Sequence, residues 1–101
     1  MGTSSITPAI VDEFKERMRL SHSSEDSNIK RLLSFSYNRI KSSCGDFDIE
    51  ESETGKELVF ERTRYSYNDA VEFFEDNFIA ELNSFALSLL PDEIGEPNEE
   101  V

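Results

Sequence analysis

Apolar residues recur at helical spacing near the start of this chain. The first run consists of Ile10, Val11, Phe14 and Met18. Charged residues fill the positions between them, as expected of a helix with one buried side. Thr7 followed by Pro8 is typical of a helix start, because a threonine hydroxyl can cap the first turn and proline fits the first helical position. We predict a helix over about residues 7–19.

A second apolar stripe follows a short polar connection. Its members are Ile29, Leu32, Leu33, Tyr37, Ile40 and Cys44. Ser23 or Ser24 is in place to cap the helix, and Glu25 and Asp26 favour its positive N-terminal end. Gly45 stands where a helix-ending glycine is common. These signals predict a helix over about residues 24–44, which is the best-bounded helix of the sequence.

The next segment, about residues 46–56, is acidic and shows no sustained period, so we expect a loop there. Residues 58–90 contain no Pro or Gly and are helical in pattern throughout. One straight helix of that length would span about 50 Å, which is long for a small domain. We expect a break at Asp76–Asn77, and Ser66 with Asp69 offers an alternative. Leu58-Val59-Phe60 could instead form a strand, because Val and Phe favour extended backbone.

Together these patterns predict an all-α fold. We expect a small bundle of about four helices, over about residues 7–19, 24–44, 57–76 and 77–90. Residues 1–90 would form one domain, since a chain of 101 residues is too short for two independent cores. Pro91 would end the last helix, and residues 91–101 are expected to form a disordered acidic tail.

Charge is unevenly distributed along the chain. All 10 bases and 12 of the 22 acids lie in residues 1–64, so the 10 acids of residues 65–101 have no base among them. A net charge of −12 disfavours binding to phosphate backbones and to anionic membranes. No stretch approaches the ~20 apolar residues of a spanning helix. With Cys44 as the only cysteine, no internal disulfide is possible, which suits a reducing compartment.

Catalytic machinery is hard to find in this sequence. His22 is the only histidine, so any Ser–His or Cys–His pair must use it, and it lies in a Ser-rich turn. Close carboxylate pairs are expected by chance among so many acids. The loop from Asp46 to Glu57 resembles a calcium loop only faintly, because Glu51 stands where glycine is needed. We therefore expect no enzyme activity, no cofactor, no metal and no small-molecule substrate.

Residue types that are common at protein interfaces are concentrated in the middle of the third predicted helix. The residues are Arg62, Arg64, Tyr65, Tyr67, Asn68 and Asp69. Arg and Tyr are enriched at the centres of protein–protein interfaces, so this segment is a candidate interface. The alternative is a core helix whose tyrosines pack inward while its arginines pair with nearby acids. Both interpretations can hold for different residues.

Three segments carry a resemblance to a known family. They are Val11-Asp12-x-Phe14-Lys15-x-x-Met18-Arg19-Leu20, Glu25-Asp26-x-x-Ile29-x-x-Leu32-Leu33, and Glu61-Arg62-x-Arg64-Tyr65-x-Tyr67-Asn68-Asp69-Ala70-x-Glu72-x-Phe74-Glu75-x-Asn77-Phe78. With them, residues 11–90 resemble the small head–tail connector proteins (head-completion or adaptor proteins) of long-tailed bacteriophages and prophages. The third segment is the most specific of the three.

This resemblance implies a structural role without catalysis or cofactor. Copies of the chain would form a ring below the portal protein, extend the DNA channel and dock a tail-side head-closure protein. DNA would pass through without specific binding. The location would be the head–tail junction of the virion, assembled in the bacterial host cytoplasm. The acidic loop and the acidic tail depart from the family pattern.

The charge division suggests how neighbouring subunits would meet. We expect the bases of the second helix to pair with the acids near the C-terminal end of a neighbour. The bases are Lys30, Arg31, Arg39 and Lys41, and the acids are Glu72, Glu75, Asp76 and Glu81. Two other functions stay open. One is a small acidic regulatory protein that mimics DNA or inhibits a basic partner, and the other is a helix-turn-helix regulator built on residues 8–44.

Overall fold

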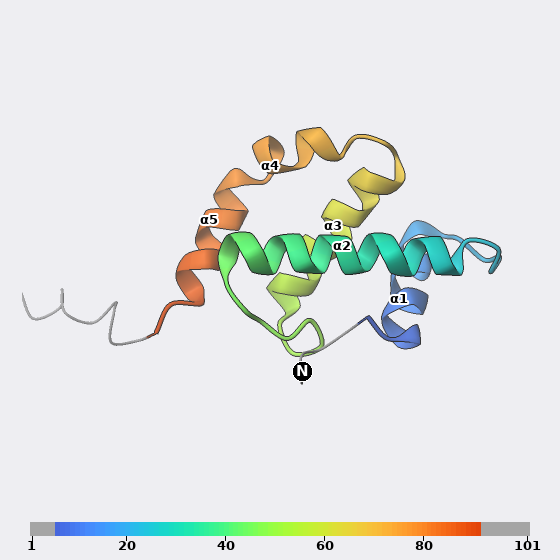
Figure 1. Ribbon diagram of the computed structural model, residues 1–101, viewed down its shortest axis with the longest axis horizontal. Helices are drawn as coiled ribbons and strands as arrows, with labels where there is room; N and C mark the ends of the chain where they lie inside the picture. The colour runs from blue at the N-terminus through green and yellow to red at the C-terminus, as the bar shows by residue number, and fades with distance from the viewer. Residues whose placement is uncertain (1–5, 92–101) are drawn as a thin grey trace, which may run out of the picture.

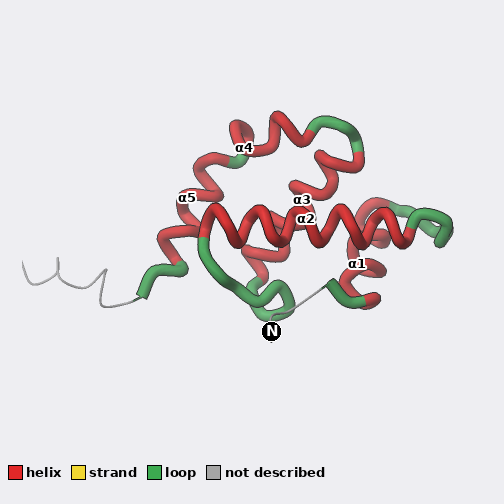
Figure 2. Tube along the Cα trace, in the orientation of Figure 1, coloured by secondary structure: helices red, strands yellow, loops and turns green. Residues whose placement is uncertain are grey.

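The computed structural model describes residues 6–91, and within that range every regular element is helical (Figures 1 and 2). The elements in chain order are α1 (Pro8–Met18), α2 (Asp26–Cys44), α3 (Glu53–Tyr67), the 3₁₀ helix η1 (Val71–Phe73), α4 (Phe74–Asn77) and α5 (Ile79–Ser88). The predicted all-α class is confirmed for this part of the chain. Residues 92–101 of the predicted tail lie outside the described residues.

Helix α2 crosses α3 at the centre of the molecule, and the other helices lie around this pair (Figure 1). Helix α1 lies near the N-terminal half of α2, while α5 lies beside the C-terminal end of α2. The largest fully buried side chains among the described residues are Phe14, Phe60 and Phe74. The rings of Phe14 and Phe60 meet edge to face with centroids 5.6 Å apart, joining α1 to α3. The core therefore sits around α3.

The start of α1 follows the sequence prediction. The Thr7 hydroxyl accepts a hydrogen bond from the Ile10 backbone N–H, and Pro8 is the first helical residue. Ile6, just before the cap, is buried with Val11. Helix α1 ends at Arg19, whose φ of 62° is left-handed.

The predicted cap of α2 is wrong. The helix begins at Asp26 rather than at residue 24, and its capping position is Glu25, which makes no side-chain cap bond. The hydroxyl of Ser24 is instead within hydrogen-bonding distance of His22 Nδ1, at 3.0 Å. The predicted stripe is confirmed at its centre, where Ile29, Leu33, Tyr37 and Ile40 are all buried. Gly45 follows the helix, as expected.

The segment predicted as a loop over residues 46–56 is shorter in the structure. Helix α3 begins at Glu53, because the Ser52 hydroxyl caps it by accepting from the Gly55 backbone N–H at 3.0 Å. Residues 53–56 are therefore helical. The strand alternative for residues 58–60 is also wrong, since these residues continue α3. All three are buried because α3 is covered on several sides.

The long helical stretch breaks twice, where one break was predicted. Helix α3 ends at Tyr67, close to the alternative break at Ser66, and Asp69 adopts a left-handed φ of 60°. Ala70 N–H donates to the Tyr65 carbonyl and Asp69 N–H to the Ser66 carbonyl, which is the Schellman arrangement that closes a helix. The second break, at Phe78, lies next to the preferred Asp76–Asn77. The predicted helices 57–76 and 77–90 are replaced accordingly.

Candidate protein-interaction surfaces

The predicted interface segment at the end of α3 divides into packing residues and exposed ones. The Tyr65 ring meets Phe74 and Phe78 edge to face, at centroid distances of 5.7 and 5.8 Å. Its hydroxyl accepts a hydrogen bond from Asn77 Nδ2 at 2.9 Å. Arg64 lies over the Tyr65 ring and pairs with Glu61 at 2.7 Å. Tyr65 thus holds α3 to the α4 region, while Arg64 makes its contacts within α3, as in the core-helix interpretation.

Tyr67, Asn68 and Asp69 lie in and beside the turn that ends α3. Asn68 and Asp69 are exposed, whereas Tyr67 is partly buried. A hollow of about 480 Å³ opens here, lined by Glu25, Asn28, Leu32, Ser66, Tyr67 and Asp69. This part of the predicted segment is therefore open to a partner, alongside the N-terminal half of α2.

Arg62 occupies a different place, against the middle of α2. Its Nη1 donates to the Ser36 hydroxyl at 3.2 Å, and no carboxylate of the described residues forms an ion pair with it. Burial lowers the pKa of the Arg62 guanidinium, and the neighbouring charge of Arg39 lowers it further. A second hollow, of about 250 Å³, is lined by Arg39, Arg62, Val71, Glu72 and Glu75. The structure thus brings three predicted residues, Arg62, Glu72 and Glu75, together.

The predicted pairing between neighbouring subunits needs one revision. Arg39 Nη2 and Glu75 Oε2 lie 3.1 Å apart within the same chain, so these two charges already have a partner. Lys41 lies over the Tyr37 ring at 4.5 Å, and Arg31 Nη2 donates to the Asn28 side chain at 2.7 Å. Lys30 lines a separate hollow beside Pro8 and Asp26. The four bases of α2 therefore do not all belong to one surface.

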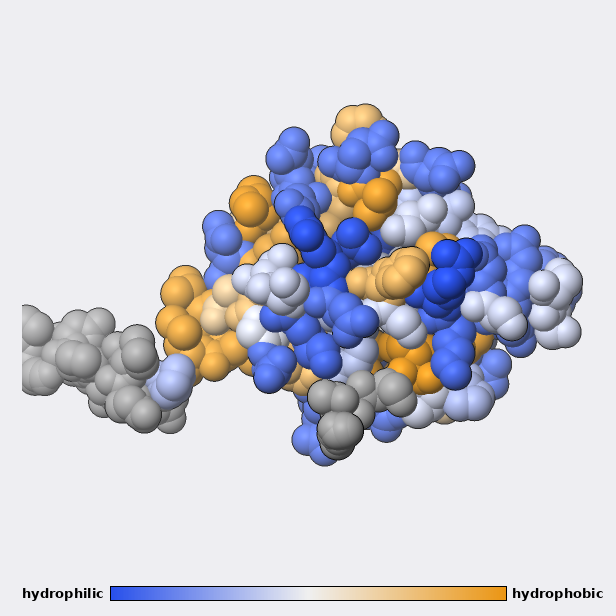
Figure 3. All heavy atoms as spheres, viewed as in Figure 1, coloured by the Kyte–Doolittle hydropathy of each residue, from blue (hydrophilic) through white to orange (hydrophobic). Residues whose placement is uncertain are grey.

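Sequence reasoning missed the exposed apolar side of α5. Ile79, Leu87 and Leu90 are 53%, 67% and 49% exposed, although each is a large apolar residue. They share one side of the helix with the partly buried Ala86, and Asn83 is the polar position among them. Figure 3 shows this end of the molecule covered by orange, apolar spheres over α5. We call Ile79, Ala86, Leu87 and Leu90 the α5 face.

A signal for the α5 face was present in the sequence. Leu82 and Phe85 are buried and Leu89 packs against the core, so these three residues suffice for the buried side of α5. Leu87 and Leu90 are additional apolar residues that this side does not need. Apolar residues beyond those needed for the buried side of a helix indicate a second apolar stripe, which a partner can cover.

His22 and Cys44 are the residues that nucleophilic catalysis would have to use. His22 Nδ1 contacts only the Ser24 hydroxyl, both residues are exposed, and among residues 6–91 no third side chain orients the imidazole. The Cys44 thiol donates to the Leu82 carbonyl at 3.5 Å, and burial raises the pKa of that thiol.

Within the described residues no group of three or more His, Cys, Asp or Glu side chains is placed to hold a metal ion. No helix of residues 6–91 is long and apolar enough to cross a membrane.

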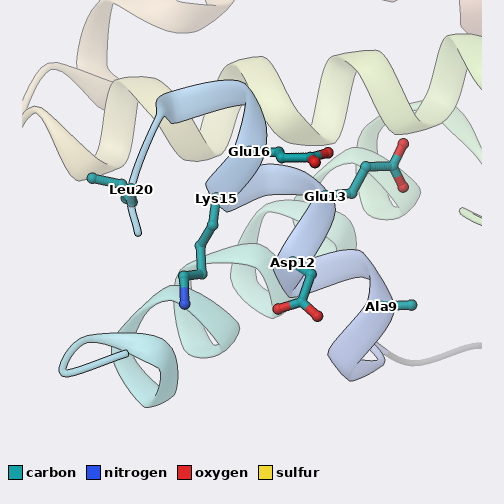
Figure 4. Close-up of a pocket in the computed structure, with 6 residues that line it drawn as sticks. All are labelled: Ala9, Asp12, Glu13, Lys15, Glu16 and Leu20. Carbon is teal, nitrogen blue, oxygen red and sulfur yellow. The ribbon is translucent and has the colours of Figure 1, made fainter. Parts of the chain in front are cut away.

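A further hollow at the surface lies against α1 (Figure 4). Its volume is about 510 Å³, and its lining residues are Ala9, Asp12, Glu13, Lys15, Glu16 and Leu20. Glu13 and Glu16 point to one side of the helix while the Lys15 ammonium points to another (Figure 4), where it pairs with Asp26 at 2.7 Å. Because all the lining comes from α1 and its immediate end, the hollow is a one-sided acidic surface rather than an enclosed site.

Comparisons of the chain with protein-family models, with curated proteins and with solved structures found no match.

Proposed function

We propose that this chain is a structural adaptor that works by binding other protein chains, as a subunit of a phage head–tail connector. Copies would form a ring below the portal protein, and the ring would continue the DNA channel toward a tail-side head-closure protein. The resemblance over residues 11–90 supports this role. The chain would then belong to the virion, at the head–tail junction.

The observation that carries the proposal is the α5 face. Ile79 and Leu87 on α5 and Leu90 just after it are large apolar side chains that are about half exposed or more, and such a group marks a protein interface. Leucine side chains cost free energy in water, at about 25 cal/mol per Å² of apolar surface. A partner that covers the α5 face recovers this free energy, so the face favours association.

The charge of the chain is compatible with a channel. Residues 65–101 carry acids and no base, so a wall built from them makes no ion pairs with DNA phosphates. DNA could then move past without being held.

Self-association of the purified chain tests the proposal. We expect the average mass in analytical ultracentrifugation to rise between low and high micromolar concentration. The variant Leu87→Glu should stay monomeric, because it places a charge in the middle of the α5 face. Ser84→Glu is the matched control: it adds the same charge to an exposed position on the same helix, outside the face, and should associate like the parent.

A parent chain that stays monomeric over the whole concentration range would contradict this proposal. If that monomer also competed with DNA for a basic protein, the acidic regulatory function would replace the adaptor function. Residues 65–101 suit that role because they contain 10 acids and no base. Equal loss of association in the Ser84→Glu and Leu87→Glu variants would indicate a general charge effect, and the α5 face would lose its role.

A further inference from the structure

A second exposed surface with interface character lies on α2. Arg31, Phe35 and Arg39 follow one another at four-residue spacing and therefore share a side of the helix. Phe35 is 55% exposed, and the Arg31 guanidinium lies 5.9 Å from the centre of its ring. Arginine and aromatic side chains are both enriched at protein interfaces. We call Arg31, Phe35, Arg39 and the adjacent Arg62 the α2 face.

Two arginines of the α2 face form no ion pair within the described residues, although the protein as a whole is acidic. Five of the 10 bases form ion pairs with carboxylates of the described residues, namely Lys15, Arg17, Arg39, Lys56 and Arg64. Arg31 and Arg62 are not among them: their guanidinium groups contact the neutral side chains of Asn28 and Ser36. In the nearby hollow only Glu72 and Glu75 supply carboxylates, and Arg39 already engages Glu75.

We propose that the α2 face is the receptor for the α5 face of a second copy of this chain. The inference rests on the proposed function and adds the identity of the two contacting surfaces. The Phe35 ring would pack against Leu87 and its apolar neighbours, while the arginines would meet acids of the α4–α5 region. Arginine can lie flat on apolar surface and still pair with a carboxylate at its tip.

Charge complementarity selects this arrangement over pairing of two α5 faces. Asp76 and Glu81 are exposed on α4 and α5, and no base follows Arg64 in the chain. Two α5 faces brought together would place like charges from both copies near each other, which costs free energy. The α2 face offers Phe35 for the apolar contact and arginines for the acids, so it satisfies both requirements.

The two surfaces lie on different parts of the molecule. The apolar surface over α5 is at one end in Figure 3, whereas the surface along α2 is mostly blue and hydrophilic. One copy can therefore use both at once, with a different neighbour on each side. A contact between two unlike surfaces is heterologous, and its repetition closes a ring or extends a filament.

Mixing two variants tests this inference. Phe35→Glu removes the α2 face and keeps the α5 face, and Leu87→Glu does the reverse. Each variant alone should be monomeric, with self-association weakened by at least about tenfold, as for central interface residues. Mixed in equal amounts, they should form a heterodimer and nothing larger, because only one intact face of each kind remains to be matched.

Recovery of association on mixing also shows that each variant is folded, since each must still present a working surface. Circular dichroism and the thermal midpoint of each variant provide a separate check, and both residues are exposed, so little change is expected. Gln variants at the same positions repeat the test without added charge if a Glu variant fails to fold.

The possible results separate this inference from the proposed function. A Phe35→Glu chain that still self-associates, with Leu87→Glu monomeric, would mean that α5 faces pair with each other; the inference fails and the adaptor function stands. Two monomeric variants that stay monomeric when mixed also overturn the inference. A parent chain that never self-associates overturns both.

Discussion

Gly55 shows how one missing side chain shapes the core. It lies in the first turns of α3 and is buried, and a Cβ built there would overlap the ring of Phe47. That ring packs edge to face between Tyr37 and Phe85, with centroids 5.2 and 5.0 Å away. Phe47 can reach this position because residue 55 has no side chain.

The contact reverses the usual effect of a helical glycine. Alanine is normally favoured over glycine inside a helix by about 1 kcal/mol. We predict that Gly55→Ala nevertheless destabilises the protein, by about 1–3 kcal/mol, because the added methyl overpacks the site. Chemical denaturation would measure the change in the free energy of unfolding.

Thr54→Ala is a matched control for this prediction, since Thr54 is the exposed neighbour in the same turn. It should change stability by no more than about 0.5 kcal/mol. A stabilised Gly55→Ala variant would mean that Phe47 moves aside freely and that helix propensity decides the outcome.

At the scale of elements, the Tyr37 side chain joins the connection between α2 and α3 to α2 by two hydrogen bonds. The Tyr37 hydroxyl donates to the Phe47 carbonyl at 2.8 Å and accepts from the Ile49 backbone N–H at 3.1 Å. Ile49 is itself fully buried. The segment 46–52 is thereby attached to α2, although its residues show no sustained apolar period.

Removing this hydroxyl should loosen the connection. We predict that Tyr37→Phe destabilises the protein by about 1–3 kcal/mol, because it leaves a buried backbone N–H and a carbonyl without their partner. Tyr65→Phe is the control, since the Tyr65 hydroxyl bonds only the exposed Asn77 side chain. Similar thermal midpoints for the two variants would mean that the Tyr37 bonds contribute little.

Two element boundaries were predictable from local signals. Thr7-Pro8 and Gly45 marked the start of α1 and the end of α2 correctly, because each signal is local. The start of α3 was missed because Glu53 to Lys56 contains no apolar residue and does contain Gly55. The break at the end of α3 was expected only as an alternative, because Asp69 closes α3 without the glycine that usually occupies a left-handed position.

The candidate surfaces were only partly predictable. Residue types pointed to Arg62 and Tyr65, but their roles depend on contacts with Ser36 and Phe74 from distant parts of the chain. Hydropathy treats Leu87 and Leu89 alike, yet Leu87 is exposed while Leu89 packs near Gly45. Only the three-dimensional arrangement shows which leucine is left for a partner.

For the whole molecule, electrostatics has two opposing effects on association. The net charge of −12 makes copies repel each other at long range, whereas the arginines of the α2 face attract at short range. At ~0.15 M salt the Debye length is about 8 Å, so the long-range repulsion is already largely screened. Salt added beyond that point acts mainly on the close pairs.

We therefore predict that self-association weakens as salt rises past ~0.15 M, where screening of close charge pairs dominates. Sedimentation at increasing NaCl concentrations would measure it. Arg62→Gln should give a flatter salt dependence, with Arg19→Gln as control because Arg19 is an exposed arginine at the end of α1, outside the α2 face. Association that strengthens steadily with salt would indicate a purely apolar contact instead.

The position of Arg64 inside α3 makes cleavage by trypsin sensitive to the opening of this helix. Trypsin cleaves after Lys and Arg, and Arg64 is the last such residue in the chain. It lies inside α3 and is held to Glu61, so its peptide bond enters a protease only when this turn of the helix opens. Everything from Tyr65 onward would then be released as one peptide. The rate at which that peptide forms would report the local opening of α3.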